Sequence, residues 1–159
     1  MEEILEILER NNKISAEQIA TMVGRDVKDV RQAIKEYEEN NVILGYNTLV
    51  DWEKTSREFV TALIEVKVTP QRGQGFDKVA RRIYKYPEVK SCYLMSGGFD
   101  LTVIVEGKTM KEVALFVAQK LAPLDSVLST STHFVLKKYK DKGTVFNDDQ
   151  GDGREAVVL

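Results

Sequence analysis

The sequence has little cysteine and little histidine, and both shortages limit the chemistry it can support. Its single cysteine, Cys92, cannot form a disulfide within the chain or a cysteine-based metal site. Its single histidine, His133, belongs to no Ser/His/Asp set and no metal-ligand cluster. We therefore expect no catalytic residues, no metal and no cofactor, and we expect that the chain is not an enzyme.

Long apolar runs are also missing. None approaches the roughly 20 residues that a membrane helix requires. The acidic, amphipathic amino terminus does not have the basic and then apolar order of a signal peptide. Together with the single cysteine, these features predict a cytoplasmic protein with no membrane partner. The net charge of −2 excludes a globally basic nucleic-acid binder, so any such contact must come from a local patch.

Apolar spacing and capping residues predict three helices in the first part of the chain. Residues 2–11 carry apolar side chains at helical spacing. Ser15 and Gln18 form a capping box that opens a second helix, and Gly24 is placed to end it in the left-handed conformation. Asp26 then caps a third helix. Two short helices joined by a tight glycine-containing turn, with a third packed against them, predict a helix-turn-helix.

A wing and a linker are predicted to follow. Two short apolar runs around Gly45, within residues 42–50, predict a small hairpin. Residues 51–58 are polar and lack periodicity, which indicates a linker with Trp52 as a packing anchor between domains. We thus predict a winged helix-turn-helix DNA-binding domain over residues 1–50.

Residues 59–140 predict a second domain. The expected elements are a strand over 60–68, a helix over 76–86, a strand over 89–95, a strand over 99–105, a helix from Thr109 to Pro123, and a strand over about 127–140. This order is the ferredoxin-like βαββαβ arrangement. The predicted fold class is α+β, with a ferredoxin-like domain for ligand sensing and oligomerisation after the winged helix-turn-helix. Residues 141–159 form an acidic tail.

The predicted sheet has two features of functional interest. Gly97 and Gly98 separate the two central strands, which predicts a tight hairpin that a small ligand or a neighbouring backbone can approach closely. The third strand carries Leu101 and Val103 on one face and Ile104 on the other, so both faces need cover. The simplest cover is the same sheet of a second copy, related by a two-fold axis. The alternative is cover by the N-terminal domain or the tail.

The third helix carries the candidate DNA-binding side chains. Residues 1–50 hold six Lys or Arg against ten Asp or Glu, a net charge of −4. At about 100° per residue, however, the basic side chains of this helix fall on one edge, with an amide beside them. Such side chains reach phosphates and base edges. The predicted set is Arg25, Lys28, Arg31, Gln32 and Lys35. The weak basicity predicts modest affinity per domain, strong salt dependence and several domains acting together. The alternative is a solvated face that binds no DNA.

Over about residues 1–142 the chain resembles the Lrp/AsnC family of transcription regulators. The resemblance rests on four stretches: Ile14–Ala20, Ile43–Tyr46, Val89–Leu101 and Ser129–Lys137. It implies a winged helix-turn-helix on palindromic operators in double-stranded DNA. It also implies homodimers built sheet to sheet, and often octamers of four dimers. The acidic N-terminal domain and the long acidic tail depart from the usual look of the family.

The same resemblance implies an effector site. In this family a free amino acid or a related small molecule binds between dimers, near the hairpin. Carried over, the effector-binding residues are Ser96, Gly97, Gly98, Phe99, Asp100, Thr130 and Thr132. Asp100 would hold a ligand ammonium, and the glycine N–H groups a carboxylate. The implied function is a transcriptional regulator whose oligomer assembly responds to the effector. The alternatives are a ligand-sensing module without DNA binding and a sirohaem-decarboxylase-like enzyme.

Overall fold

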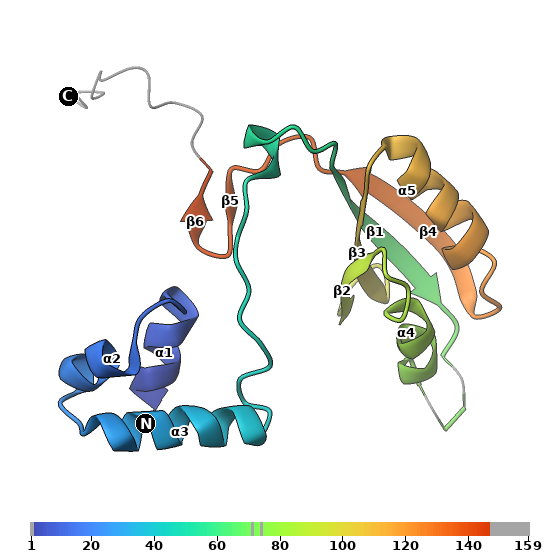
Figure 1. Cartoon of the computed structure of the whole chain (residues 1–159). Coiled ribbons are helices and arrows are strands. Elements are labelled where there is room, and N and C mark those ends of the chain that lie inside the picture. The colour runs from blue at the N-terminus through green and yellow to red at the C-terminus, as the bar shows by residue number, and fades with distance from the viewer. Residues whose placement is uncertain (1, 71, 74, 147–159) are drawn as a thin grey trace, which may run out of the picture. The chain divides into compact units, whose positions relative to one another are not determined.

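The computed structural model describes residues 2–70, 72–73 and 75–146. The chain divides into two compact units, with the boundary between Val50 and Asp51. In order, the elements are α1 (Glu2–Arg10), α2 (Ala16–Val23), α3 (Val27–Glu39), the 3-10 helix η1 (Trp52–Lys54), β1 (Val60–Val68), α4 (Asp77–Ile83), β2 (Val89–Leu94), β3 (Leu101–Gly107), α5 (Met110–Phe116), the π-helical turn η2 (Val117–Leu121), β4 (Val127–Phe134), β5 (Lys140–Asp141) and β6 (Thr144–Val145) (Figure 1). Among the described residues, no helix is both long enough and apolar enough to cross a membrane.

The first unit is a helix-turn-helix whose helix ends follow the sequence signals. The Ser15 hydroxyl accepts a hydrogen bond from the Gln18 amide, and the Gln18 side chain accepts one from the Ser15 amide. Gly24 ends α2 at φ 65°, in the left-handed conformation that glycine adopts without a Cβ clash. Asp26 caps α3 by accepting the Lys28 amide at 2.7 Å. The three helices pack around a small apolar core that consists of Ile4, Ile19, Ala20, Val30 and Ala33.

The hairpin predicted over residues 42–50 is not formed, since the structure has no strand there. This segment is bonded to the helices rather than to itself. The amides of Val42 and Ile43 both donate to the Tyr37 carbonyl, at 2.8 and 3.0 Å. The Tyr46 hydroxyl donates to the Glu38 carboxylate at 2.8 Å. An isolated two-stranded ribbon is only marginally stable in water, so these contacts with α3 decide the path of the segment.

The second unit is a four-stranded antiparallel sheet in the order β2-β3-β1-β4. This is the ferredoxin-like order predicted from the sequence. Alternate residues of β1 and β3 point to one face, where they pack against α4 and α5 in a single core. The buried residues of that core are Ala62, Ile64, Val66, Val68, Val79, Ile83, Leu101, Val103, Val105, Val113, Phe116, Val117, Leu121 and Leu124. The helix predicted over 76–86 is shorter in the structure, at Asp77–Ile83.

The glycine pair does not form the predicted two-residue turn. The last β2–β3 pair is Leu94 with Leu101, so six residues, 95–100, connect the strands. Gly97 has φ 143°, whereas Gly98 does not adopt a positive φ. The cause lies on β1, because the Asp100 amide donates to the Val66 carbonyl at 3.1 Å, and this bond draws the end of the loop towards that strand.

The last strand is also shorter than predicted. β4 ends at Phe134, which pairs with Ala62 near the beginning of β1. The Val135 amide still donates to the Thr61 carbonyl at 2.9 Å, but beyond this point β1 offers no further partner. Lys140 instead begins the small β5–β6 hairpin, which turns through Lys142 and Gly143, both with positive φ. The predicted acidic tail lies outside the described residues from position 147 onward.

Candidate functional site

All five side chains predicted to contact DNA are exposed, either on α3 or just before it. α3 buries Val30 and Ala33, which turns the opposite side of the helix to solvent. Lys28, Arg31 and Lys35 therefore form one row at spacings of three and four residues. The capped start and the buried stripe hold this row in a fixed orientation within the unit. The row can donate hydrogen bonds to phosphates and to base edges.

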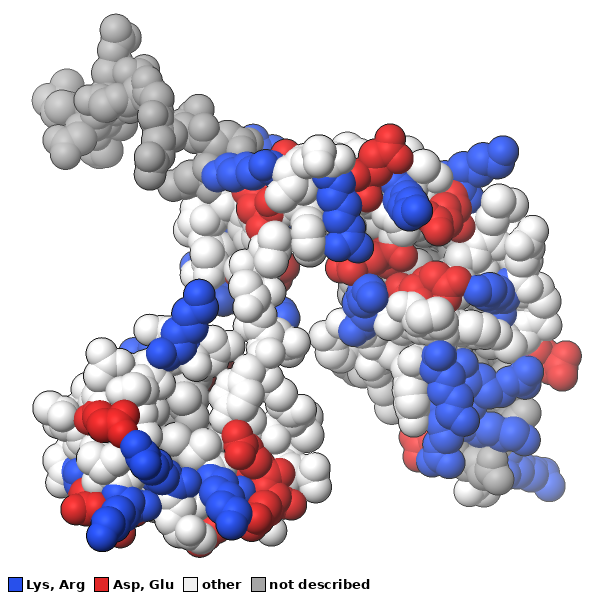
Figure 2. All heavy atoms as spheres, viewed as in Figure 1, with Lys and Arg blue, Asp and Glu red and all other residues white. Residues whose placement is uncertain are grey.

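The row is paired with carboxylates to a degree that the sequence pattern did not indicate. Arg31 forms an ion pair with Glu17 of α2, and Lys35 lies 3.6 Å from a carboxylate oxygen of Glu39. The Gln32 amide donates to Glu36 at 2.9 Å. Figure 2 shows Lys and Arg interleaved with Asp and Glu over this unit. Within the described part of the chain, Arg25 and Lys28 form no ion pair.

The Glu17–Arg31 pair is exposed to water on both sides. A hydrogen bond from its own backbone amide, followed by the Arg31 side chain, lowers the pKa of Glu17. Both side chains are more than half exposed. Exposed pairs of this kind contribute little to stability, so Arg31 can exchange the carboxylate for a phosphate at small cost.

The glycine loop divides into an exposed part and an anchored part. Ser96, Gly97 and Gly98 are exposed, whereas Phe99 and Asp100 are half-buried. The Asp100 carboxylate accepts the Val68 amide at 2.9 Å, and this bond fastens the loop to the end of β1. One carboxylate oxygen thus has a structural role. Accessible backbone N–H groups in the exposed part are suited to a carboxylate ligand.

The two predicted threonines lie on β4 in different relations to this loop. Thr130 pairs with Val66, which in turn pairs with Leu101, so Thr130 is level with the end of the glycine loop. Thr132 pairs with Ile64 and lies two positions further along the strand. Because residues opposite one another in an antiparallel pair share a face, both threonines point to the helix-covered side, where they are half-buried.

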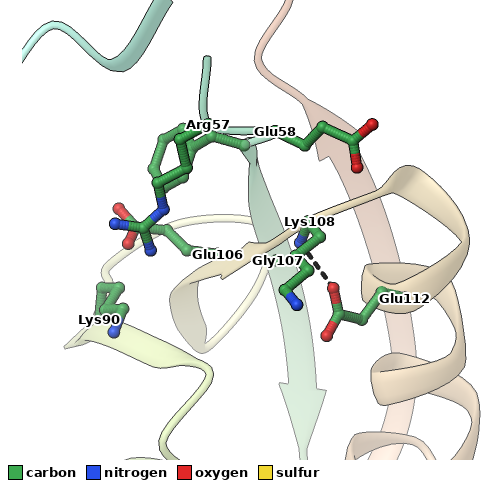
Figure 3. Close-up of a pocket in the computed structure, with 8 residues that line it drawn as sticks. Arg57, Glu58, Lys90, Glu106, Gly107, Lys108 and Glu112 are labelled. Carbon is green, nitrogen blue, oxygen red and sulfur yellow. Dashed lines mark hydrogen bonds between the residues drawn. The ribbon is translucent and has the colours of Figure 1, made fainter. Parts of the chain in front are cut away.

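A charged cavity of about 320 Å³ lies at the other end of the sheet (Figure 3). Three segments that are distant in sequence line it, which is why sequence patterns missed it. Its lining residues are Arg57, Glu58, Phe59, Lys90, Glu106, Gly107, Lys108 and Glu112. Across the described chain no ion pair joins these cations to these carboxylates, although the Lys108 amide donates to Glu112 at 2.6 Å. Opposite charges around one cavity suit a zwitterion.

Gly107 and Arg57 shape this cavity. A Cβ at Gly107 would lie 3.0 Å from Val113 Cγ2 and 3.2 Å from Glu112 Oε2, so a larger residue would displace the Glu112 carboxylate. The Arg57 guanidinium lies 4.3 Å from the centroid of the Trp52 ring, which stacks beneath it. These contacts of Trp52 are with its own unit, and its predicted role as an anchor between the domains stays a prediction.

Metal-ligating side chains and the single thiol were the other groups considered in the sequence. Among the residues that the structure describes, no group of three or more His, Cys, Asp or Glu could hold a metal ion. Burial raises the pKa of the Cys92 thiol, which disfavours the reactive thiolate.

The two units define a class of protein: a helix-turn-helix DNA-binding head followed by an α+β sensor domain. The family model for the winged helix-turn-helix DNA-binding domain matches residues 2–43, and the model for the Lrp/AsnC ligand-binding domain matches residues 61–145. The chain therefore belongs to the Lrp/AsnC family. It is a transcriptional regulator and not an enzyme, so the sirohaem-decarboxylase alternative falls away.

Relatives in sequence and structure agree with this assignment. The uncharacterized HTH-type transcriptional regulator YugG of Bacillus subtilis is 52% identical over 158 residues, which cover 99% of this chain and 94% of the relative. The leucine-responsive regulatory protein of Haemophilus influenzae is 30% identical over 86% of this chain and 82% of its own length. A transcriptional regulator from Neisseria meningitidis, solved with L-Met, has the same fold, with a TM-score of 0.72, 23% identity, and coverage of 91% of this chain and 92% of its own.

Proposed function

We propose that this regulator binds operator DNA through α3 and that an amino acid or a related small molecule changes the assembly of its copies. The carrying observation is the exposed row of Lys28, Arg31 and Lys35, held on a capped helix of a helix-turn-helix. The relative solved with L-Met supports an amino-acid effector. A change in assembly would alter the spacing of the DNA-binding domains and therefore the affinity for an operator with several sites. We propose that the protein acts in the cytoplasm.

We propose a homodimer as the basic unit, with octamers built from dimers. The support is the face of the sheet that α4 and α5 leave open, where Leu63 and Ile104 lie directly opposite one another. Two further side chains of this face, Thr61 and Thr102, are 8% and 6% exposed. A second sheet packed on this apolar centre would remove it from water, as in an isologous two-fold interface.

We place the effector at the glycine loop, with the exposed N–H groups of residues 96–98 as donors to its carboxylate. The charged cavity between Arg57 and Glu112 is the second candidate place. A thermal-shift screen with the twenty amino acids identifies the ligand, because binding to the native state alone raises the melting temperature. Sedimentation with and without that ligand then reports the change in assembly.

Two variants separate the candidate effector sites. Gly98 has an ordinary backbone conformation and open space at its Cβ position, so Gly98→Val keeps the fold while it obstructs the loop. Arg57→Ala removes a cation from the cavity. If the loop is the site, Gly98→Val loses the ligand-induced melting shift and Arg57→Ala keeps it. The reverse result would move the effector to the cavity.

The DNA-binding role is tested with the triple variant Lys28→Ala, Arg31→Ala and Lys35→Ala. We expect operator affinity to fall by about tenfold or more, with a reduced salt slope. The control removes two exposed cations of the same unit outside α3, Arg10→Ala and Lys13→Ala, and should bind nearly as the parent does. Equal binding by all three proteins would exclude α3 as the contact, and absence of binding by all three, at low salt, would support the ligand-sensing module without DNA binding.

A further inference from the structure

Basic side chains gather on α4, on the loop before it and on the turn after it. Between residues 72 and 85 the sequence has five Lys or Arg and one acidic residue, Asp77, which gives a local charge of +4 in a chain whose net charge is −2. The five cations are Arg72, Lys78, Arg81, Arg82 and Lys85, and all of them are exposed. Figure 2 shows Lys and Arg gathered over α4, with few acidic side chains among them.

This basic α4 surface differs from the α3 row in its lack of counter-charges. Within the described residues, none of the five cations forms an ion pair, whereas Arg31 and Lys35 of α3 each have one. Lys78 and Arg82 are four residues apart, as are Arg81 and Lys85. Like charges at this spacing repel one another on a helix. An anionic partner that covers this surface therefore lowers its electrostatic free energy.

We propose that the α4 surface binds the phosphate backbone of DNA as a second, sequence-independent contact of this regulator. The proposal builds on the DNA-binding role proposed for α3. The seven residues of α4 extend over roughly 10 Å at about 1.5 Å per residue. Duplex DNA presents one charge per roughly 1.7 Å, so it can engage several of these cations at once, which a small anion cannot do.

Charge balance favours DNA as the partner. The first unit has a net charge of −4 and repels phosphate on average. Two cations of its α3 row, Arg31 and Lys35, are already paired with Glu17 and Glu39. The positive charge of the α4 surface, which belongs to the second unit, compensates for the weak attraction of the first unit for phosphate. Tyr84, 54% exposed on the same short segment, adds a hydroxyl of the kind that bonds phosphate oxygens. A hollow of about 340 Å³ beside Lys78 and Arg81, also lined by Gly73 and by the carboxylate-bearing Asp77, leaves room for a phosphate group.

The test compares full-length variants on random-sequence duplexes of increasing length, over a series of salt concentrations. Arg81→Ala with Lys85→Ala removes two cations from the α4 surface. The matched control, Lys111→Ala with Lys140→Ala, removes two exposed cations of the same unit that lie outside the α4 surface. We expect the α4 variant to lose most of the affinity that longer duplexes add. Its plot of log affinity against log salt should flatten by roughly 0.9 for each phosphate that the variant leaves without a cation. Circular dichroism melts verify that both variants fold.

The proposal is overturned if the α4 variant matches its control in affinity and in salt slope on the long duplexes. It also falls if the α4 variant changes self-association, measured by sedimentation, while DNA binding stays intact. That second result would make the surface a contact between copies. Neither outcome tests the DNA-binding role proposed for α3. That role is contradicted separately if the triple α3 variant keeps its preference for the operator over random DNA.

Discussion

At the scale of single residues, the ion pair between Glu17 and Arg31 sets how much of the α3 row is available to DNA. Glu17→Gln removes the competing carboxylate and leaves Arg31 in place. We expect operator affinity to rise by roughly two- to fivefold, because exposed pairs of this type are weak. Fluorescence anisotropy with labelled operator measures the change. The control Glu9→Gln removes one negative charge from α1. An equal gain in operator affinity for this control would show that the effect arises from net charge and not from the release of Arg31.

A second residue-scale prediction concerns pH and the Glu88–Lys120 pair, at 2.5 Å. The hydrogen bond from Lys120 lowers the pKa of Glu88 below its usual value of 4.5. The pair therefore stabilises the fold above that value, and its contribution is lost as pH falls through the lowered pKa. Because the Lys120 side chain is 43% exposed, we expect Lys120→Met to cost only about 0.5–1 kcal/mol at neutral pH.

Urea unfolding at a series of pH values measures this effect. The difference between the parent and Lys120→Met should shrink to nothing in acid, where Glu88 is protonated in both proteins. Glu88→Gln serves as the control, since its stability should lack this pH-dependent component. A difference that stays constant down to strongly acidic pH would assign the loss to the contacts of the Lys120 ammonium with the Tyr86 and Phe116 rings instead.

At the scale of elements, the turn between α2 and α3 depends on Gly24. Its φ of 65° costs roughly 1–2 kcal/mol for a residue with a Cβ. We expect Gly24→Ala to lower the free energy of unfolding by about 1 kcal/mol and to weaken DNA binding through a misdirected α3. The control is Gly45→Ala, where φ is ordinary and no atom lies within 4 Å of the new Cβ. That change should be neutral or slightly stabilising. Equal losses in both variants would contradict the argument.

Local sequence signals predicted most helices and strands. Pairing between distant residues determined the end of β4 and the width of the glycine loop, which those signals did not predict. The caps at Ser15, Gly24 and Thr109 act over three or four residues, so the sequence shows them directly. The alternation of β1 likewise predicts which of its faces is buried. In contrast, β4 ends where β1 stops offering partners, and the glycine loop widens because Asp100 bonds to β1. Such bonds join residues more than thirty positions apart, and no local pattern encodes them.

The candidate sites follow the same division. Helical spacing alone predicted that Lys28, Arg31 and Lys35 share an exposed edge of α3. The partner of Arg31 lies on a different helix, so its pairing could not be predicted from that spacing. The charged cavity is lined by three segments that are distant in sequence, and it forms only once the sheet is assembled.

At the scale of the whole molecule, charge is distributed in a way that the net value conceals. The first unit carries −4, and residues 72–85 carry +4, within a total of −2. The head that reads DNA is therefore the weaker electrostatic partner, and the sensor unit holds the denser group of cations. This distribution favours binding in which each head contributes sequence preference and the α4 surface contributes sequence-independent affinity.

The open face of the sheet is the other whole-molecule feature, and it yields the last prediction. Leu63 and Ile104 form its apolar centre, while His133 lies 3.5 Å from the Glu65 carboxylate at its polar margin. If two sheets pack through this face, Ile104→Glu places two like charges in the buried centre of a two-fold interface. We expect the variant to sediment as a monomer, because an unpaired charge buried at an interface costs several kcal/mol.

Analytical ultracentrifugation over a range of concentrations measures the assembly, and circular dichroism verifies that the variant is folded. Lys111→Glu, at an exposed position of α5 on the helix-covered side, is the matched control and should assemble as the parent does. Since a monomer presents one DNA-binding head, Ile104→Glu should also lose the affinity gained from paired operator half-sites and keep that for a single half-site. An Ile104→Glu protein that assembles like the parent would show that the copies meet through some other surface.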